Sequence, residues 1–459
     1  MRPVIEPAAP QPPVPRPSGP PSRLPLAIAV LVLLVTLVGV GSLLLVGAGQ
    51  PAASNAPSGT SPSITPSPAP SGSGPGASGS AGASGGLSDP QLLAAIAAVE
   101  AQVPALRGLQ PTREVPSRVI GEAQLVAELK QRFRDENPHE RIAAQGAFLT
   151  RLGLLPAGAD LEALEERLLG SQVIGFYDDK AKALSVVQRG GSFGPLERTT
   201  VAHEFTHALQ DQHFGLARLG TDDPSNGDRA SARLALVEGD ATLLMGLWST
   251  RYLSAAEQLD LLRQSSDPQQ LALLATLPPF LVQQLLFPYQ QGAAFVSGLY
   301  ARGGWPAVDA VYERPPDSSA QVLHPDLYAG HVAPLPVDGG ATALARALDA
   351  TRGSGWHATY QDTLGEFTLG QWLARGAGTD GAASAAGWRG DGAVYLEGPA
   401  GHWYLVIKAV LEGSDEAARF AAAATASLAG LDGQSRVETA PDGRTVTVTL
   451  ADVPLLPPS

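Results

Sequence analysis

One short stretch, residues 200–214, restricts the architecture of this chain more than any other part. It contains the pattern HExxH, formed by His203, Glu204 and His207. On an α-helix, residues four apart lie about 40° apart around the axis, so both imidazoles lie on one face. Two neutral imidazoles on one face can hold Zn²⁺. Glu204 is placed to take a proton from a zinc-bound water.

An alternative interpretation is a core helix whose two histidines are simply hydrogen-bonded. The chain has only 8 His in 459 residues. We expect three fixed positions to match HExxH by chance in about one such chain in a hundred, or fewer. This rarity favours a zinc site. The sequence has no cysteine, so any zinc must be held by His, Asp or Glu side chains.

Two residues compete for the place of the third ligand. His213 stands six residues after His207, as in the pattern HExxHxxGxxH. That pattern needs a glycine to turn the chain, and Gln210 occupies its position here. If the helix continues, His213 lies roughly 80–120° away from the two histidines. It is therefore predicted to be a helix-end or surface residue.

Glu238 is the stronger candidate, since it lies on a mostly apolar stripe of a helical pattern at residues 228–248. A buried carboxylate there is costly without a partner, and zinc would be one; the alternative is a buried structural acid. Gly239 can let another segment approach closely. Asp240 and Asp211 could each orient a ligand histidine, although a solvated surface acid is the preferred interpretation of both.

The stretches HEFTHALQDQHF and LVEGDATLL resemble the gluzincin metallopeptidases, in which both histidines of HExxH and a downstream glutamate hold zinc. They look similar to exported bacterial and archaeal proteins with a HE-x-THALQDQ helix. GFYDDK, FPYQQG and SSAQVLHPDLY are similar too, so the resemblance covers roughly residues 115–425. It implies a gluzincin-like core that binds zinc through His203, His207 and Glu238. One departure is Thr242, which stands where thermolysin-like gluzincins have an aspartate that orients a ligand histidine.

The N-terminal region predicts a membrane anchor. Residues 1–23 are Pro-rich and are expected to form a disordered cytoplasmic tail. Residues 24–48 are apolar and uncharged, and about 25 residues suffice to span a bilayer as a helix. A cleaved signal peptide has a shorter apolar core. The next basic residue after Arg23 is Arg107, so the N-terminus is predicted to be cytoplasmic and the remainder extracytoplasmic.

Residues 49–87 are rich in Ser, Gly, Pro and Ala and predict a disordered, flexible stalk with a reach of about 35 Å. Residues 88–330 are expected to form a helical region and the zincin-like core, and residues 331–459 a small α+β module. The fold class is therefore α+β with a mainly helical core. The net charge of −13, without a basic cluster, argues against a nucleic-acid partner.

Within the core, helical patterns run near 121–134, 138–153 and 159–169. A β-hairpin is predicted from residues 172–177 and 183–187. A strand just before a zinc helix can pair with an extended peptide, but an ordinary sheet strand is equally favoured. Pro288 is expected to interrupt the helical pattern near residue 287, and Gly303 to begin a turn.

An oxyanion in zincin chemistry is often stabilised by a Tyr or His hydrogen bond. His324 is the first candidate, followed by Tyr289, with Tyr177 and Tyr328 also possible. Each could instead pack in the core or form a loop hydrogen bond. The sequence thus predicts a single-pass, extracytoplasmic zinc metallopeptidase acting on peptides or proteins, with Glu204 as general base. The alternatives are an inactive surface adaptor, with or without zinc, and an envelope-binding protein.

Overall fold

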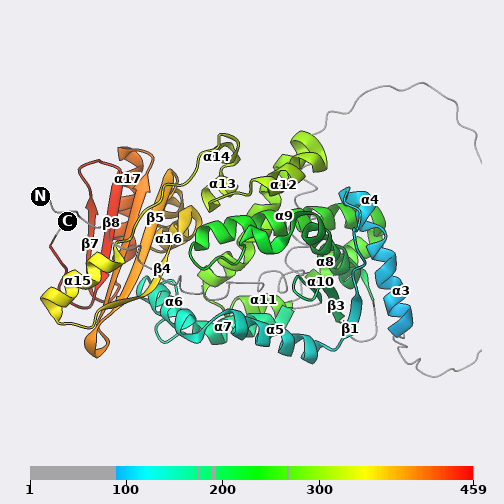
Figure 1. Ribbon diagram of the computed structural model, residues 1–459, viewed down its shortest axis with the longest axis horizontal. Coiled ribbons are helices and arrows are strands. Elements are labelled where there is room, and N and C mark those ends of the chain that lie inside the picture. The colour runs from blue at the N-terminus through cyan, green and yellow to red at the C-terminus, as the bar shows by residue number, and fades with distance from the viewer. Residues whose placement is uncertain (1–88, 173–174, 188–192, 266–267, 458–459) are drawn as a thin grey trace, which may run out of the picture.

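The computed structural model describes residues 89–172, 175–187, 193–265 and 268–457. The predicted tail (1–23), membrane anchor (24–48) and stalk (49–87) lie outside the described residues. Among the described helices, none combines the length and the apolar character that crossing a membrane requires. The chain folds into a mainly helical α+β structure, with a β-sheet at one end beside a larger helical part (Figure 1).

Three long helices form the centre of the helical part: α8 (Pro195–Phe214), α9 (Gly227–Tyr252) and α12 (Pro279–Glu313). Helix α8 begins at a proline, whose missing N–H costs nothing in the first turn. The Glu197 carboxylate accepts a hydrogen bond from Gly194 N–H at 2.9 Å. Gly215 ends the helix with a left-handed φ of 68°, which favours glycine.

Helices α9 and α12 approach each other closely at two glycines. A Cβ on Gly239 would lie 2.3 Å from the backbone of Gly292, and one on Gly292 would lie 2.1 Å from Ala235 O. Neither position therefore has room for a side chain. The predicted close approach at Gly239 is confirmed, and it fixes α12 against the helix that carries Glu238.

The predicted interruption at Pro288 is wrong. Helix α12 continues through this residue, which is buried with its neighbours Phe287 and Tyr289. Burial of these side chains outweighs the one helical hydrogen bond that a proline, which has no N–H, cannot donate. The helical conformation instead breaks at Gly303 and Gly304, where the φ angles are −156° and 64°. A turn was predicted there from the glycines.

A small sheet packs beside α8. Its strands β1 (Ser117–Ile120), β2 (Gly175–Asp178) and β3 (Ala183–Val187) lie in the order β1-β3-β2. Strands β2 and β3 form the predicted hairpin, and β1 pairs parallel to β3. The first strand was expected from residue 172, but Gln172 ends helix α7, and residues 173–174 lie outside the described residues. Because β3 is the central strand, the strand just before the metal helix has no edge for a peptide. The predicted pairing of a peptide with this strand is therefore wrong. Within the described residues, β2 is an edge strand.

The C-terminal part contains a five-stranded antiparallel sheet in the order β4-β5-β6-β8-β7. It is α+β, as predicted, although β4 and α15 were not expected. The division at residue 330 stays a prediction, and the buried core crosses it: the rings of Phe148 and Tyr360 are 4.9 Å apart. The elements are β4 (His357–Asp362), β5 (Trp388–Glu397), β6 (Trp403–Leu411), β7 (Gln434–Thr439), β8 (Thr445–Ala451), α15 (Ala341–Arg352), α16 (Gly365–Ala383) and α17 (Ser414–Leu428).

Shorter helices surround the centre, and three of them match the helical patterns predicted before the hairpin. Figure 1 places α5, α6 and α7 as a layer along one side of the central helices. The shorter helices are α3 (Asp89–Glu100), α4 (Val103–Arg107), α5 (Glu122–Glu136), α6 (His139–Arg151), α7 (Leu161–Gln172), α10 (Ala255–Ser265), α11 (Pro268–Leu274), α13 (Ser319–Leu323) and α14 (Pro325–Ala329), with 3-10 turns η1 (Leu216–Leu219) and η2 (Pro399–Gly401).

Candidate metal centre

Helices α8 and α9 bring two imidazoles and one carboxylate together. His203 and His207 lie one turn apart on α8, and their Nε2 atoms are 3.0 Å from each other. Glu238 of α9 places Oε2 3.2 Å from His203 Nε2 and 3.5 Å from His207 Nε2. All three side chains are fully buried. Within the described part of the chain, these residues form a group that could hold a metal ion.

The spacing of the three ligand atoms fits zinc. With zinc–ligand distances near 2.0–2.1 Å, two ligand atoms of a tetrahedral site lie about 3.3 Å apart. The three observed separations, 3.0, 3.2 and 3.5 Å, bracket that value. Three protein ligands leave a fourth position open, which is typical of catalytic rather than structural zinc sites.

Buried carboxylate oxygens provide a second observation in favour of a cation. Oε1 of Glu238 and Oε1 of Glu204 have no hydrogen-bond partner, and the neighbours of Glu238 Oε2 are the two imidazole nitrogens that would share the ion with it. An ionised carboxylate in such a place is costly unless a positive charge lies beside it. A divalent cation at the triad would supply that charge.

Gln210 orients one of the ligand histidines. Its Oε1 lies 2.8 Å from His207 Nδ1, and its Nε2 donates to Val237 O at 3.0 Å. The carboxamide oxygen therefore takes the Nδ1–H of His207 and leaves Nε2 free to bind a metal. One signal of this role was visible in the sequence, because Gln210 occupies the glycine position of the longer motif. Thr242, at the position where thermolysin-like gluzincins have an aspartate, is buried and its Oγ1 has no hydrogen-bond partner.

The preferred interpretation of Asp240 and Asp211 as solvated acids is wrong, because both are buried. The Asp240 carboxylate accepts from Arg107 Nε at 2.8 Å and Nη2 at 2.9 Å, and from Tyr312 O–H at 2.8 Å. Asp211 accepts from Tyr177 O–H at 2.8 Å. Among the hydrogen bonds of the described residues, those of Asp240 and Asp211 go to groups other than the ligand histidines. Sequence reasoning missed Arg107, a guanidinium with no exposed surface.

The other candidate residues are placed differently from one another. Tyr289 is buried beside the triad, with its ring centroid 6.4 Å from that of His203 and its hydroxyl without a hydrogen-bond partner. His324 instead places Nε2 2.6 Å from Glu366 Oε1 of α16. His213 is exposed and contacts Gln110 O at 2.7 Å, in agreement with a helix-end role. Tyr328 O–H donates to the carbonyl oxygen of residue 314.

Of the two first candidates, Tyr289 lies beside a triad residue, whereas His324 contacts Glu366. His324 precedes Pro325 in the turn between α13 and α14, and this turn packs against α16. Its ring is therefore hydrogen-bonded to the Glu366 carboxylate. The loop sequence alone could not indicate which acid would be its neighbour.

Burial and mutual charge shift the pKa values of these groups in the metal-free protein. Burial raises the pKa of Glu204 to about 8. Burial by itself would lower the pKa of His207, but the carboxylates of Glu238 and Glu204 and the hydrogen bond to Gln210 together outweigh it and raise that pKa. Conversely, although burial opposes it, the imidazoles lower the pKa of Glu238. The site therefore holds protons that a metal ion would displace.

A cavity of about 110 Å³ is lined by residues of the helices that carry Glu238 and Tyr289, but not by the triad itself. Leu234, one turn before Glu238, lines it, as does Pro288, which precedes Tyr289. The cavity also reaches Ile142 of α6 and Leu168 of α7, so its wall is partly apolar. It is thus formed between the central helices and the layer that contains α6 and α7.

Comparison of the chain with protein-family models, with curated proteins and with solved structures finds no match. The interpretation of the centre therefore rests on its own geometry. That geometry establishes a buried His-His-Glu triad able to hold a metal ion, beside a buried carboxylate and a tyrosine.

Proposed function

We propose that this protein is a membrane-anchored, extracytoplasmic zinc metallopeptidase. The observation that carries the proposal is the set of three ligand separations, close to the edges of a zinc tetrahedron, with the Glu204 carboxylate beside them. His203, His207 and Glu238 would hold the ion. Membrane anchoring rests on the apolar, uncharged residues 24–48.

The side chains around the triad can perform the proton transfers of peptide hydrolysis. A bound zinc would supply Lewis acidity and a water of lowered pKa. Glu204 has an unpartnered oxygen, Oε1, that can accept a proton and pass it to the leaving amine. The Tyr289 hydroxyl, which has no other partner, can donate a hydrogen bond to a developing oxyanion.

A peptide is the substrate class that fits the surroundings of Glu204. Strand β2 has one edge away from β3, and its Tyr177 N–H points to Glu204 Oε2 at 2.9 Å. An extended chain along this edge would run past the general base. The cavity beside Leu234 could receive an apolar side chain of that chain. Because the triad is fully buried, substrate entry requires the surrounding elements to move apart.

The test is Glu204→Gln in the full chain, with His203→Ala as a control. We expect zinc content to be unchanged in Glu204→Gln and the cleavage of unfolded protein to fall about 10²–10⁴-fold, the range for loss of a general base. His203→Ala should lose zinc and activity together. Cleavage at the wild-type rate by Glu204→Gln would refute the proposed mechanism.

Complete burial of the triad favours one second candidate, an inactive zinc-binding surface adaptor. In that case zinc stabilises the fold and no substrate reaches it. This candidate predicts a zinc-dependent melting temperature but no cleavage of any unfolded protein by the wild type. The proposed peptidase predicts a zinc-dependent melting temperature together with cleavage of unfolded protein.

A further inference from the structure

Tyr177 contacts helix α8 at two points. Its backbone N–H donates to Glu204 Oε2 at 2.9 Å, and its hydroxyl donates to Asp211 Oδ2 at 2.8 Å. Glu204 and Asp211 are seven residues apart, which is two helical turns, so they lie on one stripe of α8. A single residue of β2 thus connects to the general base by its backbone and to a second acid by its side chain.

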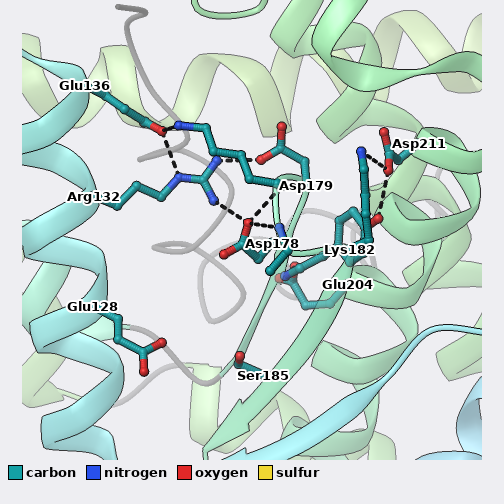
Figure 2. Close-up of polar contacts among 12 residues, drawn as sticks. Glu128, Arg132, Glu136, Asp178, Asp179, Lys182, Ser185, Glu204 and Asp211 are labelled. Atoms are coloured by element: carbon teal, nitrogen blue, oxygen red, sulfur yellow. Dashed lines mark hydrogen bonds and ion pairs between the residues drawn. The ribbon is translucent and has the colours of Figure 1, made fainter.

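Asp211 gathers several donors in the same place. Lys182 Nζ lies 2.6 Å and Arg113 Nη2 3.2 Å from its Oδ2. Leu216 N–H donates to its Oδ1. The carboxylate is almost fully buried, and charge-assisted hydrogen bonds of this kind are stronger than neutral ones. Lys182 is the last residue of the hairpin turn, directly before β3. Asp211 therefore contacts β2 through Tyr177 and the end of the turn through Lys182 (Figure 2).

A separate group of ion pairs holds the outer side of the same turn. Arg132 of α5 lies between Glu136 and the hairpin acids Asp178 and Asp179 (Figure 2). Arg132 Nη1 is 3.1 Å from Asp178 Oδ1. The ion pairs of this group join Arg132 to Glu136, Asp178 and Asp179, and are separate from the hydrogen bonds of Glu204 and Asp211. The group therefore offers a control within the same hairpin.

We propose that Tyr177 positions Glu204 for proton transfer and that Asp211 holds Tyr177 in place; this inference rests on the proposed function. The Tyr177 N–H fixes Oε2 of Glu204, and Oε1, which has no hydrogen-bond partner, is the oxygen that accepts the proton. Tyr177 and Asp211 are positioning residues, because they act through Glu204. A carboxylate held by one oxygen keeps the other aimed at the reacting water.

The test compares Tyr177→Phe and Asp211→Asn with Asp179→Asn, each in the full chain. Tyr177→Phe keeps the buried ring and removes only the hydroxyl. We expect kcat to fall about 10- to 100-fold in the first two variants while KM changes less than about twofold, because a misplaced base affects the chemical step. Zinc content should stay at the wild-type level. In Asp179→Asn, kcat should stay at the wild-type level.

Hydrogen exchange of the Tyr177 amide gives a readout independent of activity. We expect slow exchange in the wild type and faster exchange in Glu204→Ala, Tyr177→Phe and Asp211→Asn, in zinc-loaded and metal-free protein alike. Unchanged exchange and unchanged kcat in both Tyr177→Phe and Asp211→Asn would overturn the inference. An equal loss of kcat in Asp179→Asn would also overturn it, as a general effect on the hairpin. Absence of peptide cleavage by the wild type would instead reject the proposed function, and amide exchange would still report whether Asp211 holds Tyr177 against Glu204.

Discussion

At the scale of single residues, Gln210 orients the metal-binding triad. It is fully buried and joins His207 of α8 to Val237 O of α9, one residue before Glu238. It thereby fixes the ring of one ligand and the backbone beside another. Groups that orient metal ligands in this way commonly contribute about 10- to 100-fold to metal affinity.

Gln210→Leu should therefore weaken zinc binding by about 10- to 100-fold, because the Nδ1–H of His207 loses its acceptor. The measurement is a zinc titration against a competing chelator. Gln212→Leu is the matched control, since Gln212 lies on the same helix but contacts residues 112–113. Equal zinc affinities in Gln210→Leu and the wild type would contradict this role.

Arg107 and Asp240 form a buried ion pair. Asp240 lies two residues after the proposed ligand Glu238. Arg107→Met should lower the free energy of unfolding by about 3–5 kcal/mol, because Asp240 stays buried without its cation. Urea unfolding measures this loss. Adding Asp240→Asn to Arg107→Met should restore part of the stability, since the unpaired charge is then gone. A double variant less stable than Arg107→Met would show that the charge is not the cause.

At the scale of helices, the crossing of α9 and α12 positions Glu238. Gly239→Ala would place a methyl group 2.3 Å from the Gly292 backbone, so the helices must separate. Overpacking of this kind costs about 1–3 kcal/mol of stability. We expect Gly239→Ala to bind zinc more weakly as well, since Glu238 moves with α9.

Gly298→Ala serves as the control for the helix crossing. Gly298 lies in α12, like Gly292, but a Cβ there would meet only an Arg302 side-chain atom at 3.7 Å. Alanine should therefore be neutral or stabilise the helix by up to about 1 kcal/mol. Thermal unfolding and zinc titration of the two variants distinguish close packing from an ordinary effect of glycine.

At the scale of the whole molecule, Asp228 joins the helical part to the C-terminal part. Its Oδ1 accepts from Ser319 N–H at 3.0 Å, and its own N–H donates to Thr363 O at 3.1 Å. Its Oδ2 has no hydrogen-bond partner. Burial raises the pKa of Asp228 from 3.8 to about 7, and that of the neighbouring Asp391 to about 6. This junction should make stability depend on pH.

Between its unfolded pKa of 3.8 and about pH 7, the folded protein keeps a proton on Asp228 that the unfolded chain has lost. The free energy of unfolding should therefore fall as pH rises through this range and level off above it. In Asp228→Asn, the free energy of unfolding should depend less on pH. At pH 8 this variant should be more stable than the wild type by about 1–3 kcal/mol.

Urea unfolding at pH 5 and pH 8 checks this dependence. Asp442→Asn is the control, because hydrogen bonds lower the pKa of Asp442 to about 2, below the range tested. That variant should keep the pH dependence of the wild type. An equally steep loss of stability in Asp228→Asn would assign the effect to other groups.

The sequence by itself determined the local parts of this protein. The spacing of His203 and His207 on one helical face, and the acid Glu238 on an apolar stripe, follow from the 3.6-residue period. The hairpin before α8 and the α+β character of the C-terminal part follow from strand periodicity and turn residues. Each of these depends on residues close together in the chain, whose conformation is set by backbone sterics and local burial.

Only the tertiary structure decided which distant groups meet. Arg107 reaches Asp240 across 133 positions and His324 reaches Glu366 across 42, and no local pattern identifies either partner. The central place of β3 depends on β1, which begins 66 positions before it. Such contacts arise when helices and strands pack to bury apolar surface, and each buried polar group must then find a partner among whatever side chains packing brings to it.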